Sequence, residues 1–413
     1  MKVAVVGSGI AGLACAHRLQ NEAEVVLFEA DARLGGHTDT HSIWADGRSY
    51  AADSGFIVFN RDNYPGFSAW LDELGVASQT SDMSFGVRNV GTGLEYGTGT
   101  LGALLCQRRN VLRPRFLRML RDLRRFYGDA HKFADDTLTL GELVQREGYG
   151  NGFVADHLVP MCSALWSVGT KPASDIDASH VINFMTHHKM LQLAGRPEWR
   201  VVTGGSTRYV EAFRANFTGQ IRVGDGVLGV ERQPSGVRLR TVSGEHHVDA
   251  VVLACHSDQA LAMLEDPSAA ERQILGSIEY QPNRVVVHSD PSVMPRRKAA
   301  WSSWNAVADA AHPDRCQVTY WMNRLQGLPP GSVDFFVTLN PSSSLRRVWS
   351  ERQYAHPVFS NAARAAQQRH FEISGVRNTF YCGAYWGWGF HEDGFASAER
   401  VVAAIGERMS HAA

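Results

Sequence analysis

The first thirty residues alternate between apolar runs and a glycine-rich stretch. Residues 3–6 are three valines and an alanine, a run typical of a buried parallel strand. Glycines follow at positions 7, 9 and 12, and residues 13–19 have the apolar content of a helix. A second apolar run at residues 25–28 ends in an acid. This order predicts a βαβ unit with a glycine-rich turn after its first strand.

The glycine spacing is that of a dinucleotide site. Gly7 allows a tight turn, Gly9 lets the backbone approach a pyrophosphate, and Gly12 lets helix and strand pack closely. Ile10 and Ala11 would begin the helix, whose unpaired N–H groups and partial positive charge favour phosphates. The alternative is a doubly wound domain with an empty cleft, but the order of strand, glycines, helix, strand and acid favours nucleotide binding.

The acid at the end of the second strand indicates which nucleotide binds. Glu29, followed by Ala30, can accept hydrogen bonds from ribose hydroxyls. Its negative charge disfavours a 2′-phosphate, which argues against NADP.

A second glycine pair favours FAD over NAD. Residues 33–38 read Arg-Leu-Gly-Gly-His-Thr. FAD continues past its pyrophosphate into a ribityl–flavin arm, and a glycine pair would let the chain lie against that arm. Arg33, the first residue of this segment, is either a counter-charge for the pyrophosphate or an ordinary surface arginine. The FAD contacts predicted in this segment are Arg33, Gly35, Gly36, His37 and Thr38.

Later segments return the chain to the same domain. More strands are predicted from the alternation of apolar and polar residues at 221–223 and 237–241 and from an apolar run at 249–254. Between them, Val227 is a candidate for backbone contact with the adenine.

The C-terminal segment is the last predicted piece of the nucleotide domain. A strand-like run at 378–382 enters a glycine turn, and His-Glu-Asp-Gly at 391–394 precedes a helix expected over about 395–409. Amides at that helix start would face the flavin pyrimidine edge and stabilise reduced flavin. Alternatively, Glu392 and Asp393 are only acids favoured by the helix dipole. The flavin contacts predicted here are Gly383, Asp393, Gly394 and Phe395.

Composition and length fit a two-domain globular protein. The chain has 413 residues, which is more than one hydrophobic core usually serves. We assign residues 1–60, 200–265 and 375–413 to an FAD-binding domain, and residues 61–199 and 266–374 to a substrate domain. The fold class is therefore α/β, with a Rossmann-like dinucleotide domain and a mixed sheet-and-helix substrate domain.

Charge and cysteine content exclude several other classes. The net charge of −1 gives no general attraction to nucleic acid, and the six cysteines lack metal or redox spacing, so no metal site is expected. No apolar run could span a membrane, and the early glycines interrupt any export signal. We expect a cytoplasmic protein, and the oligomeric state stays open.

One predicted helix of the substrate domain is strongly basic. Pro114 would start it, with Phe116, Leu120, Leu123 and Tyr127 at helical spacing. Eight arginines lie between Arg108 and Arg125, against the single acid Asp122. The stretch is either a solvated helix face or a cationic face that docks on anionic phospholipid at the inner side of the membrane. No recognition motif supports nucleic acid.

These motifs together resemble the flavin-containing amine oxidase superfamily, which includes phytoene desaturases and protoporphyrinogen oxidases. The residues on which this resemblance rests are Gly7–Gly12, Glu29, residues 33–36, Thr203-Gly204-Gly205-Ser206 and the Gly394 segment. Segments 53–60, 320–326 and 390–394 are similar to a bacterial branch of NAD/FAD-binding proteins within it. Members of that branch often accompany lipid-methylating enzymes, and one is the desaturase of the furan fatty acid pathway. The resemblance implies a two-domain FAD enzyme of the amine oxidase type.

Two departures from the amine oxidase pattern weaken an amine as substrate. The turn Gly383-Ala384-Tyr385-Trp386 has no acid after it, and His391 stands where an aromatic cage residue is usual. We predict His391 as the proton acceptor, since imidazole can titrate near neutral pH. Six aromatic residues between 380 and 390 either pack in the core, wall an apolar tunnel or form a cation cage.

Four function classes follow from the resemblance. We favour a dehydrogenase of an apolar substrate such as a methylated fatty acyl chain of a phospholipid. The others are an amine oxidase, a redox-neutral fatty acid double-bond isomerase and a non-catalytic flavin-binding protein.

Overall fold

A five-stranded parallel sheet is the centre of one half of the molecule. The computed structural model describes residues 1–166, 173–192, 195–308 and 316–412. The strand order is β10-β2-β1-β14-β20. The chain leaves β1 toward β2 on one side and returns as β14 on the other, which opens a crevice at the carboxyl end of β1. The strands are β1 (Lys2–Val6), β2 (Glu24–Glu29), β10 (Gln220–Val223), β14 (Ala250–Leu253) and β20 (Thr379–Tyr381).

Two different layers cover the faces of this sheet. Because side chains alternate along a strand, Val3 and Val5 pack with the helices on one face, and Ala4 and Val6 pack on the other face. The helical layer is α1 (Ile10–Leu19), α9 (Thr207–Asn216) and α14 (His391–Ala412). The opposite layer is an antiparallel meander of β11 (Val227–Gln233), β12 (Gly236–Thr241) and β13 (Glu245–Val248).

The other half is built on a seven-stranded mixed sheet. Its order is β19-β15-β18-β17-β16-β7-β8, and helix α7 (Val159–Trp166) packs against β16 and β17. The strands are β7 (Phe85–Asn89), β8 (Leu94–Gly97), β15 (Tyr280–His288), β16 (Trp304–Ala308), β17 (Cys316–Trp321), β18 (Phe336–Leu339) and β19 (Val348–Pro357).

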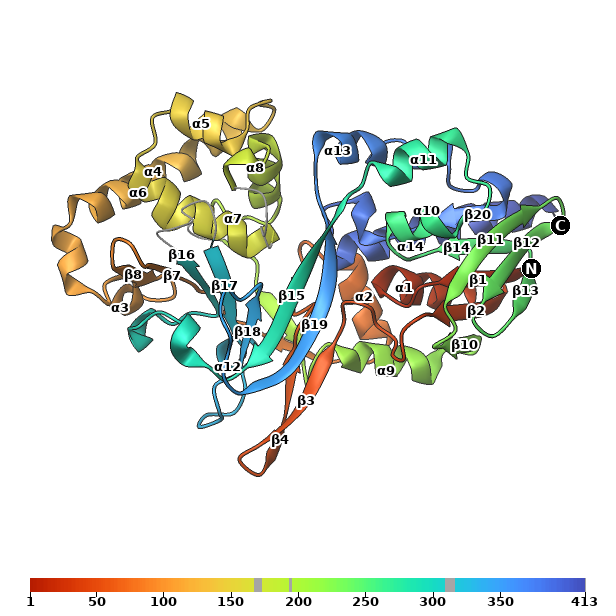
Figure 1. Cartoon of the computed structure of the whole chain (residues 1–413), viewed down its shortest axis with the longest axis horizontal. Coiled ribbons are helices and arrows are strands. Elements are labelled where there is room, and N and C mark those ends of the chain that lie inside the picture. The colour runs from red at the N-terminus through yellow and green to blue at the C-terminus, as the bar shows by residue number, and fades with distance from the viewer. Residues whose placement is uncertain (167–172, 193–194, 309–315, 413) are drawn as a thin grey trace.

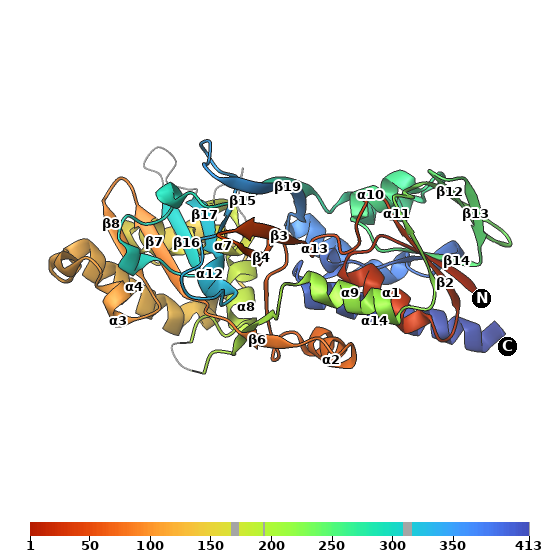
Figure 2. The same cartoon turned by 90° about the horizontal axis from the view of Figure 1, so that it is seen from below.

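The two halves lie side by side along the long axis of the molecule (Figures 1 and 2). Strands β15 and β19 run from one half toward the other, and both termini lie at the end of the parallel-sheet half. Smaller sheets are the hairpin β3 (Thr40–Ala45) and β4 (Arg48–Asp53), and the group β5 (Val58–Asn60), β9 (Trp199–Val202) and β6 (Ser78–Thr80). The remaining helices are α2 (Pro65–Glu73), α3 (Leu101–Leu104), α4 (Pro114–Asp129), α5 (Leu140–Arg146), α6 (Asn151–Phe153), α7 (Val159–Trp166), α8 (Ala178–His187), α10 (Ser257–Met263), α11 (Ala269–Gly276), α12 (Met322–Leu325) and α13 (Asn361–Gln367).

The α/β class is confirmed, and two local predictions need correction. Helix α14 begins at His391 and not near Phe395, so both predicted helix-start acids lie in its first turn. Pro114 does start α4, but its fully buried face is Phe116, Met119, Asp122 and Phe126. The predicted partners Leu120, Leu123 and Tyr127 are only partly buried, because they face a cavity. None of the described helices is long and apolar enough to cross a bilayer.

Candidate active site

One continuous cavity extends from the crevice at β1 into the half built on the seven-stranded sheet. Its volume is about 1820 Å³. Pockets for a single drug-sized ligand are about 300–1,000 Å³, so this cavity has room for a large cofactor and a substrate together. We describe it as a nucleotide arm at the parallel sheet, a middle section between the halves and an apolar arm beneath α4 and α7.

The two predicted glycine loops meet at the start of the nucleotide arm. Gly7 has a φ of +101°, which a glycine adopts without strain. A Cβ on Gly9 would meet no protein atom within 4 Å, so the space in front of it is open cavity. A Cβ on Gly36 would lie 3.1 Å from the Cα of Gly9, so the second loop packs directly on the first. Ile10 and Ala11 also line the arm, at the N-terminus of α1.

The far end of the nucleotide arm holds the predicted ribose acid. The backbone N–H of Ser8 donates to the Glu29 carboxylate at 2.9 Å, and the Ser8 hydroxyl donates to the same oxygen. The other carboxylate oxygen accepts from the Asp31 N–H at 2.8 Å. Glu29, Ala30 and Val227 all line the cavity. These contacts hold the carboxylate at the cavity wall, where ribose hydroxyls can reach it.

The predicted Arg33–Thr38 segment is held together by its own side chains. The Arg33 guanidinium donates to the carbonyls of Gly36 at 2.7 Å and Thr38 at 3.0 Å, so it braces the loop while lining the cavity. Gly35 and His37 line the cavity as well. Thr38 does not line it, because its hydroxyl is buried against the Tyr209 hydroxyl.

His391 lies at the middle section, and its environment removes its ability to titrate near neutral pH. Its ring stacks on Phe56 with centroids 3.5 Å apart, and its Nε2 lies 3.1 Å from both the Thr38 and Tyr209 hydroxyls. Burial lowers the pKa of His391 to about 3. The expectation that it titrates near neutral pH is therefore wrong, because burial disfavours the imidazolium. The geometry makes His391 a neutral group that orients Phe56 and Thr38.

Four further predicted residues lie behind the cavity wall. Asp393 accepts a hydrogen bond from the Phe390 N–H at 2.9 Å and holds the turn before α14. Phe395 packs in the core near Trp70, at a ring distance of 5.8 Å. A Cβ on Gly394 would lie 2.7 Å from the Ile10 side chain, so this glycine allows α14 to approach α1. Gly12 likewise permits close packing, since a Cβ there would lie 1.8 Å from the Gly7 carbonyl oxygen.

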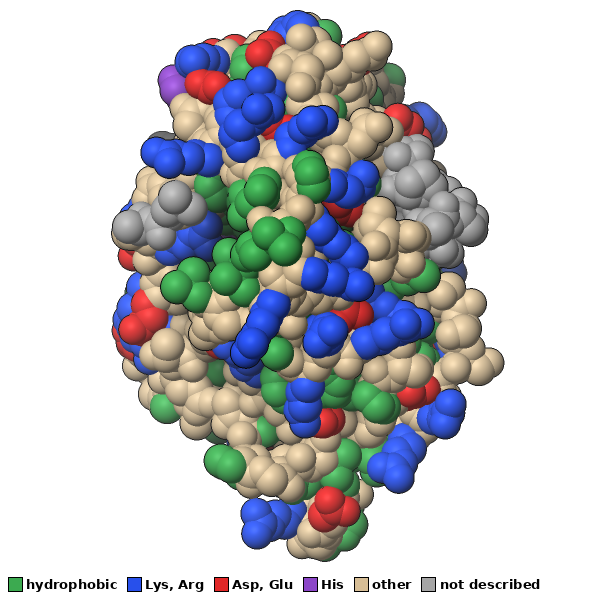
Figure 3. Space-filling model, turned by 90° about the vertical axis from the view of Figure 1, so that its left-hand side faces the viewer, with side chains coloured by type: hydrophobic (Ala, Val, Ile, Leu, Met, Phe, Trp, Pro, Cys, Tyr) green, Lys and Arg blue, Asp and Glu red, His purple; other side chains and the backbone are tan. Residues whose placement is uncertain are grey.

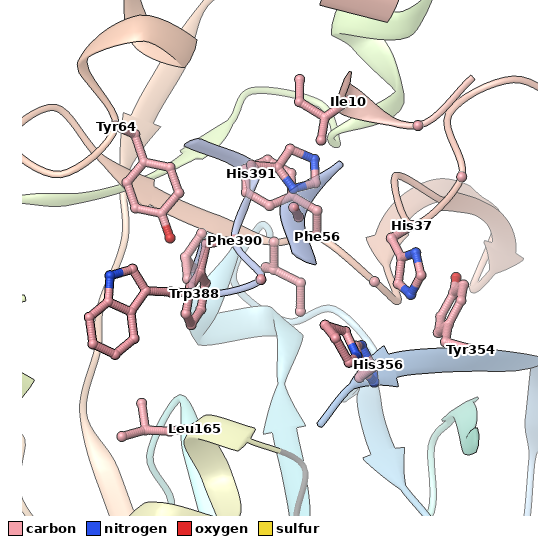
Figure 4. Close-up of a pocket in the computed structure, with 18 of the residues that line it drawn as sticks. Ile10, His37, Phe56, Tyr64, Leu165, Tyr354, His356, Trp388, Phe390 and His391 are labelled. Carbon is pink, nitrogen blue, oxygen red and sulfur yellow. The ribbon is translucent and has the colours of Figure 1, made fainter. Parts of the chain in front are cut away.

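One wall of the middle section joins the predicted residue His37 to two residues of β19 that no sequence motif indicated. His37 stacks on Tyr354 at 4.8 Å, and its ring lies 5.2 Å from that of His356 (Figure 4). Tyr354 and His356 point the same way because they are two residues apart on β19. Burial lowers the pKa of His356 to about 4, and burial followed by the neighbouring His356 lowers that of His37 well below its usual value. This wall is therefore uncharged at neutral pH.

The opposite wall and the apolar arm are mainly hydrophobic. Tyr64 and Trp388 lie across the cavity from the wall that holds His37 and His356. Leu165 of α7 lies further into the half built on the seven-stranded sheet (Figure 4). Of the six aromatics between 380 and 390, Tyr385, Trp388 and Phe390 line the cavity, and the other three lie in the core. The apolar arm continues past Leu104, Leu120, Leu123, Met161, Leu165 and Phe184.

Few charges reach the apolar arm. Among its described lining residues, the Asp82 carboxylate accepts hydrogen bonds from the Ser303 hydroxyl at 2.8 Å and from the Arg324 guanidinium at 3.0 Å. Glu198 is exposed and forms an ion pair with Arg200. Burial lowers the pKa of the lining residues His157 and His188 to about 4, so both are neutral. Lys298 lies outside the cavity lining, with 73% of its side chain exposed. The described arm thus presents no free buried carboxylate to a cationic substrate.

Comparison with known proteins agrees with this arrangement. The family model described as flavin-containing amine oxidoreductase matches residues 10–302. Similar solved structures include a CLA-producing fatty acid isomerase from P. acnes, at 15% identity, TM-score 0.70 and 97% coverage of both chains. Cyclohexylamine oxidase from Brevibacterium oxydans is 15% identical over 99% of both chains, with a TM-score of 0.71. Putrescine oxidase is 15% identical over 98% of this chain and 99% of its own, with a TM-score of 0.71. These likenesses show a shared two-domain fold.

Proposed function

This chain belongs to the flavin-containing amine oxidoreductase family and is an FAD-dependent oxidoreductase, and we propose that it dehydrogenates an apolar substrate such as a methylated fatty acyl chain of a phospholipid. The residues fit the cofactor. Two glycine loops leave an open approach at Gly9, a helix N-terminus lies beside it, and Glu29 lines the same cavity, where a ribose hydroxyl could reach its carboxylate.

The observation that carries the substrate class is the apolar arm. It is continuous with the nucleotide arm, and its described walls are mainly leucine, methionine and aromatic side chains, with Asp82, Arg196 and Glu198 as the charged residues among them. A protonated amine would be desolvated there without a free carboxylate partner, which is costly. An acyl chain instead gains about 0.8 kcal/mol for each CH₂ that it buries.

The lining side chains have three tasks in the reaction. The apolar arm holds the chain extended, and Trp388 and Phe390 restrict its approach in the middle section. The neutral His37, Tyr354 and His356 wall excludes water without placing a charge beside the chain. His391 keeps Phe56 in position through its stacked ring.

FAD, when bound, would supply the oxidising power as the acceptor of a hydride from a substrate C–H bond. In the overall conversion the substrate would lose a hydride and a proton from adjacent carbons and gain a double bond, and both hydrogens would leave with the reduced cofactor. His391 is a poor acceptor for that proton, because burial holds its pKa at about 3.

An isomerase is the second candidate. The structure named a fatty acid isomerase covers 97% of this chain. In such a reaction the hydride returns to the chain and no external electron acceptor is needed. An amine oxidase is the third candidate, and the aromatic wall at Trp388 is the feature that favours it.

The first experiment is an anaerobic spectral titration of the purified FAD-loaded protein. We expect extracted membrane lipid to bleach the flavin absorbance and amines to leave it unchanged. Lipid in which a double bond moves, without net bleaching, would favour the isomerase. Bleaching by amines alone would contradict the acyl proposal.

A further inference from the structure

The end of the molecule formed by α3, α4 and the 3₁₀ helix η1 (Arg108–Leu112) exposes leucines among arginines. Leu101, Leu112 and Leu117 are 78%, 83% and 50% exposed. Figure 3 views this end and shows a group of hydrophobic side chains surrounded by many basic and few acidic ones. Exposed leucines grouped in this way are unusual for a surface that faces only water.

The arginines of this surface are largely free to meet an external anion. Arg115 is engaged by the buried Asp156 at 2.6 Å, while Arg121 is 75% exposed and 3.4 Å from Asp122. Among the described residues, no acid forms an ion pair with Arg109 or Arg124. The face therefore carries a positive charge that the rest of this part of the protein does not neutralise.

The same elements connect the surface to the apolar arm. On α4, Leu117 is exposed, and Leu120, one turn later, lines the cavity. On α3, Leu101 is exposed and Leu104, one turn later, lines the cavity. Residues three apart on a helix are neighbours, so each helix offers an apolar path from outside to inside.

We propose that this surface docks on an anionic phospholipid bilayer and that the acyl chain passes between α3 and α4 into the apolar arm. The second half of this statement rests on the proposed function. Leucines would enter the acyl boundary while arginines contact the headgroups, as in an interfacial amphipathic helix. A second copy of the chain would bring like charges together, and nucleic acid would gain nothing from exposed leucines.

The test is cosedimentation of the FAD-loaded protein with vesicles. We expect binding to phosphatidylglycerol–phosphatidylcholine vesicles, little binding to pure phosphatidylcholine, and weakening by salt. The variant Arg109→Gln, Arg121→Gln, Arg124→Gln should bind on the order of 100-fold more weakly, since each basic residue contributes roughly fivefold. Leu101→Ser, Leu112→Ser, Leu117→Ser should also reduce binding.

The matched control is Arg48→Gln, Arg214→Gln, Arg408→Gln, which removes three exposed arginines outside this surface. It should bind as the parent does. Equal loss in both arginine variants, binding to DNA in place of vesicles, or a dimer that buries α4 would each overturn docking.

Flavin reduction by a detergent-dispersed fatty acid separates the two proposals. Vesicle binding without reduction by any acyl substrate would overturn the acyl function and the path for the chain, and leave docking supported. Reduction without vesicle binding would overturn docking alone.

Discussion

Gly9 is the residue at which cofactor and side chain would compete most directly for space. Its φ of −67° and ψ of 179° are allowed for any residue. A Cβ there meets no protein atom within 4 Å. The protein itself therefore tolerates a larger residue at this position, and only a bound dinucleotide requires glycine.

We therefore expect Gly9→Ala to fold normally and to bind FAD more weakly. The free energy of unfolding of the apoprotein should stay within about 0.5 kcal/mol of the parent. FAD affinity should fall by about tenfold or more, because overpacking of a close contact costs about 1–3 kcal/mol. Fluorescence titration with FAD and urea unfolding measure the two quantities.

Gly128→Ala is the control, since a Cβ at Gly128 also meets nothing within 4 Å and the residue lies in α4. It should leave FAD affinity unchanged. Full FAD affinity in Gly9→Ala would show that the pyrophosphate does not lie against this turn.

At the scale of elements, the first turn of α14 supports another helix as well as the cavity wall. Both Glu392 carboxylate oxygens accept hydrogen bonds at 2.9 Å, one from Gly66 N–H and one from Phe67 N–H. These N–H groups begin α2, whose N-cap residue Tyr64 makes no side-chain capping bond. Glu392 is thus a cap supplied by a distant helix, which stabilises α2 against the nucleotide domain.

Replacing Glu392 with alanine should lower the free energy of unfolding by about 1–2 kcal/mol, because two N–H groups lose a charged partner. FAD affinity should not change. Glu407→Ala, an exposed position on the same helix, is the control and should cost less than about 0.5 kcal/mol. If Glu392→Ala weakened FAD binding without loss of stability, the side chain would belong to the cofactor site.

At the scale of the whole molecule, several of the described histidines are buried as neutral rings. Burial lowers six pKa values to about 3 or 4, and raises those of Asp53 and Asp393 to about 6. Most of the six lie around the cavity, so a neutral interior coincides with the proposed apolar site. These histidines are His157, His180, His188, His288, His356 and His391.

This pattern predicts a steep loss of stability in mild acid. Below the unfolded histidine pKa of 6.5, the unfolded chain binds protons that the buried native rings do not bind. The free energy of unfolding therefore falls as the pH is lowered from 6.5 to about 4. The carboxyls whose pKa burial raises, Asp53, Glu392 and Asp393, gain protons in the native state and oppose this partly. We expect the free energy of unfolding to be several kcal/mol lower at about pH 5.5 than at about pH 7.5, as measured by urea titration. Equal stability at both values would contradict the buried neutral rings.

The sequence by itself determined what depends on neighbouring residues. The βαβ unit, the turn at Gly7, the strand ending in Glu29 and the start of α4 at Pro114 all follow from periodicity and local backbone freedom. Most of the residues predicted to bind FAD line one cavity, because one supersecondary unit holds them together. The chain length predicted two domains, and the family resemblance predicted that they are of the amine oxidase type.

Only the tertiary structure decided which distant side chains share that cavity. Phe56, Tyr354 and His356 reach it from three-dimensional packing that no local pattern encodes. The tertiary structure also sets the lowered pKa of His391 and makes Glu392 a helix cap, since desolvation and helix contacts depend on everything packed around a group. The same reason explains α4. Its apolar residues were predicted to pack together in the core, but Phe116 lies in the core while Leu120, Leu123 and Tyr127 line the cavity.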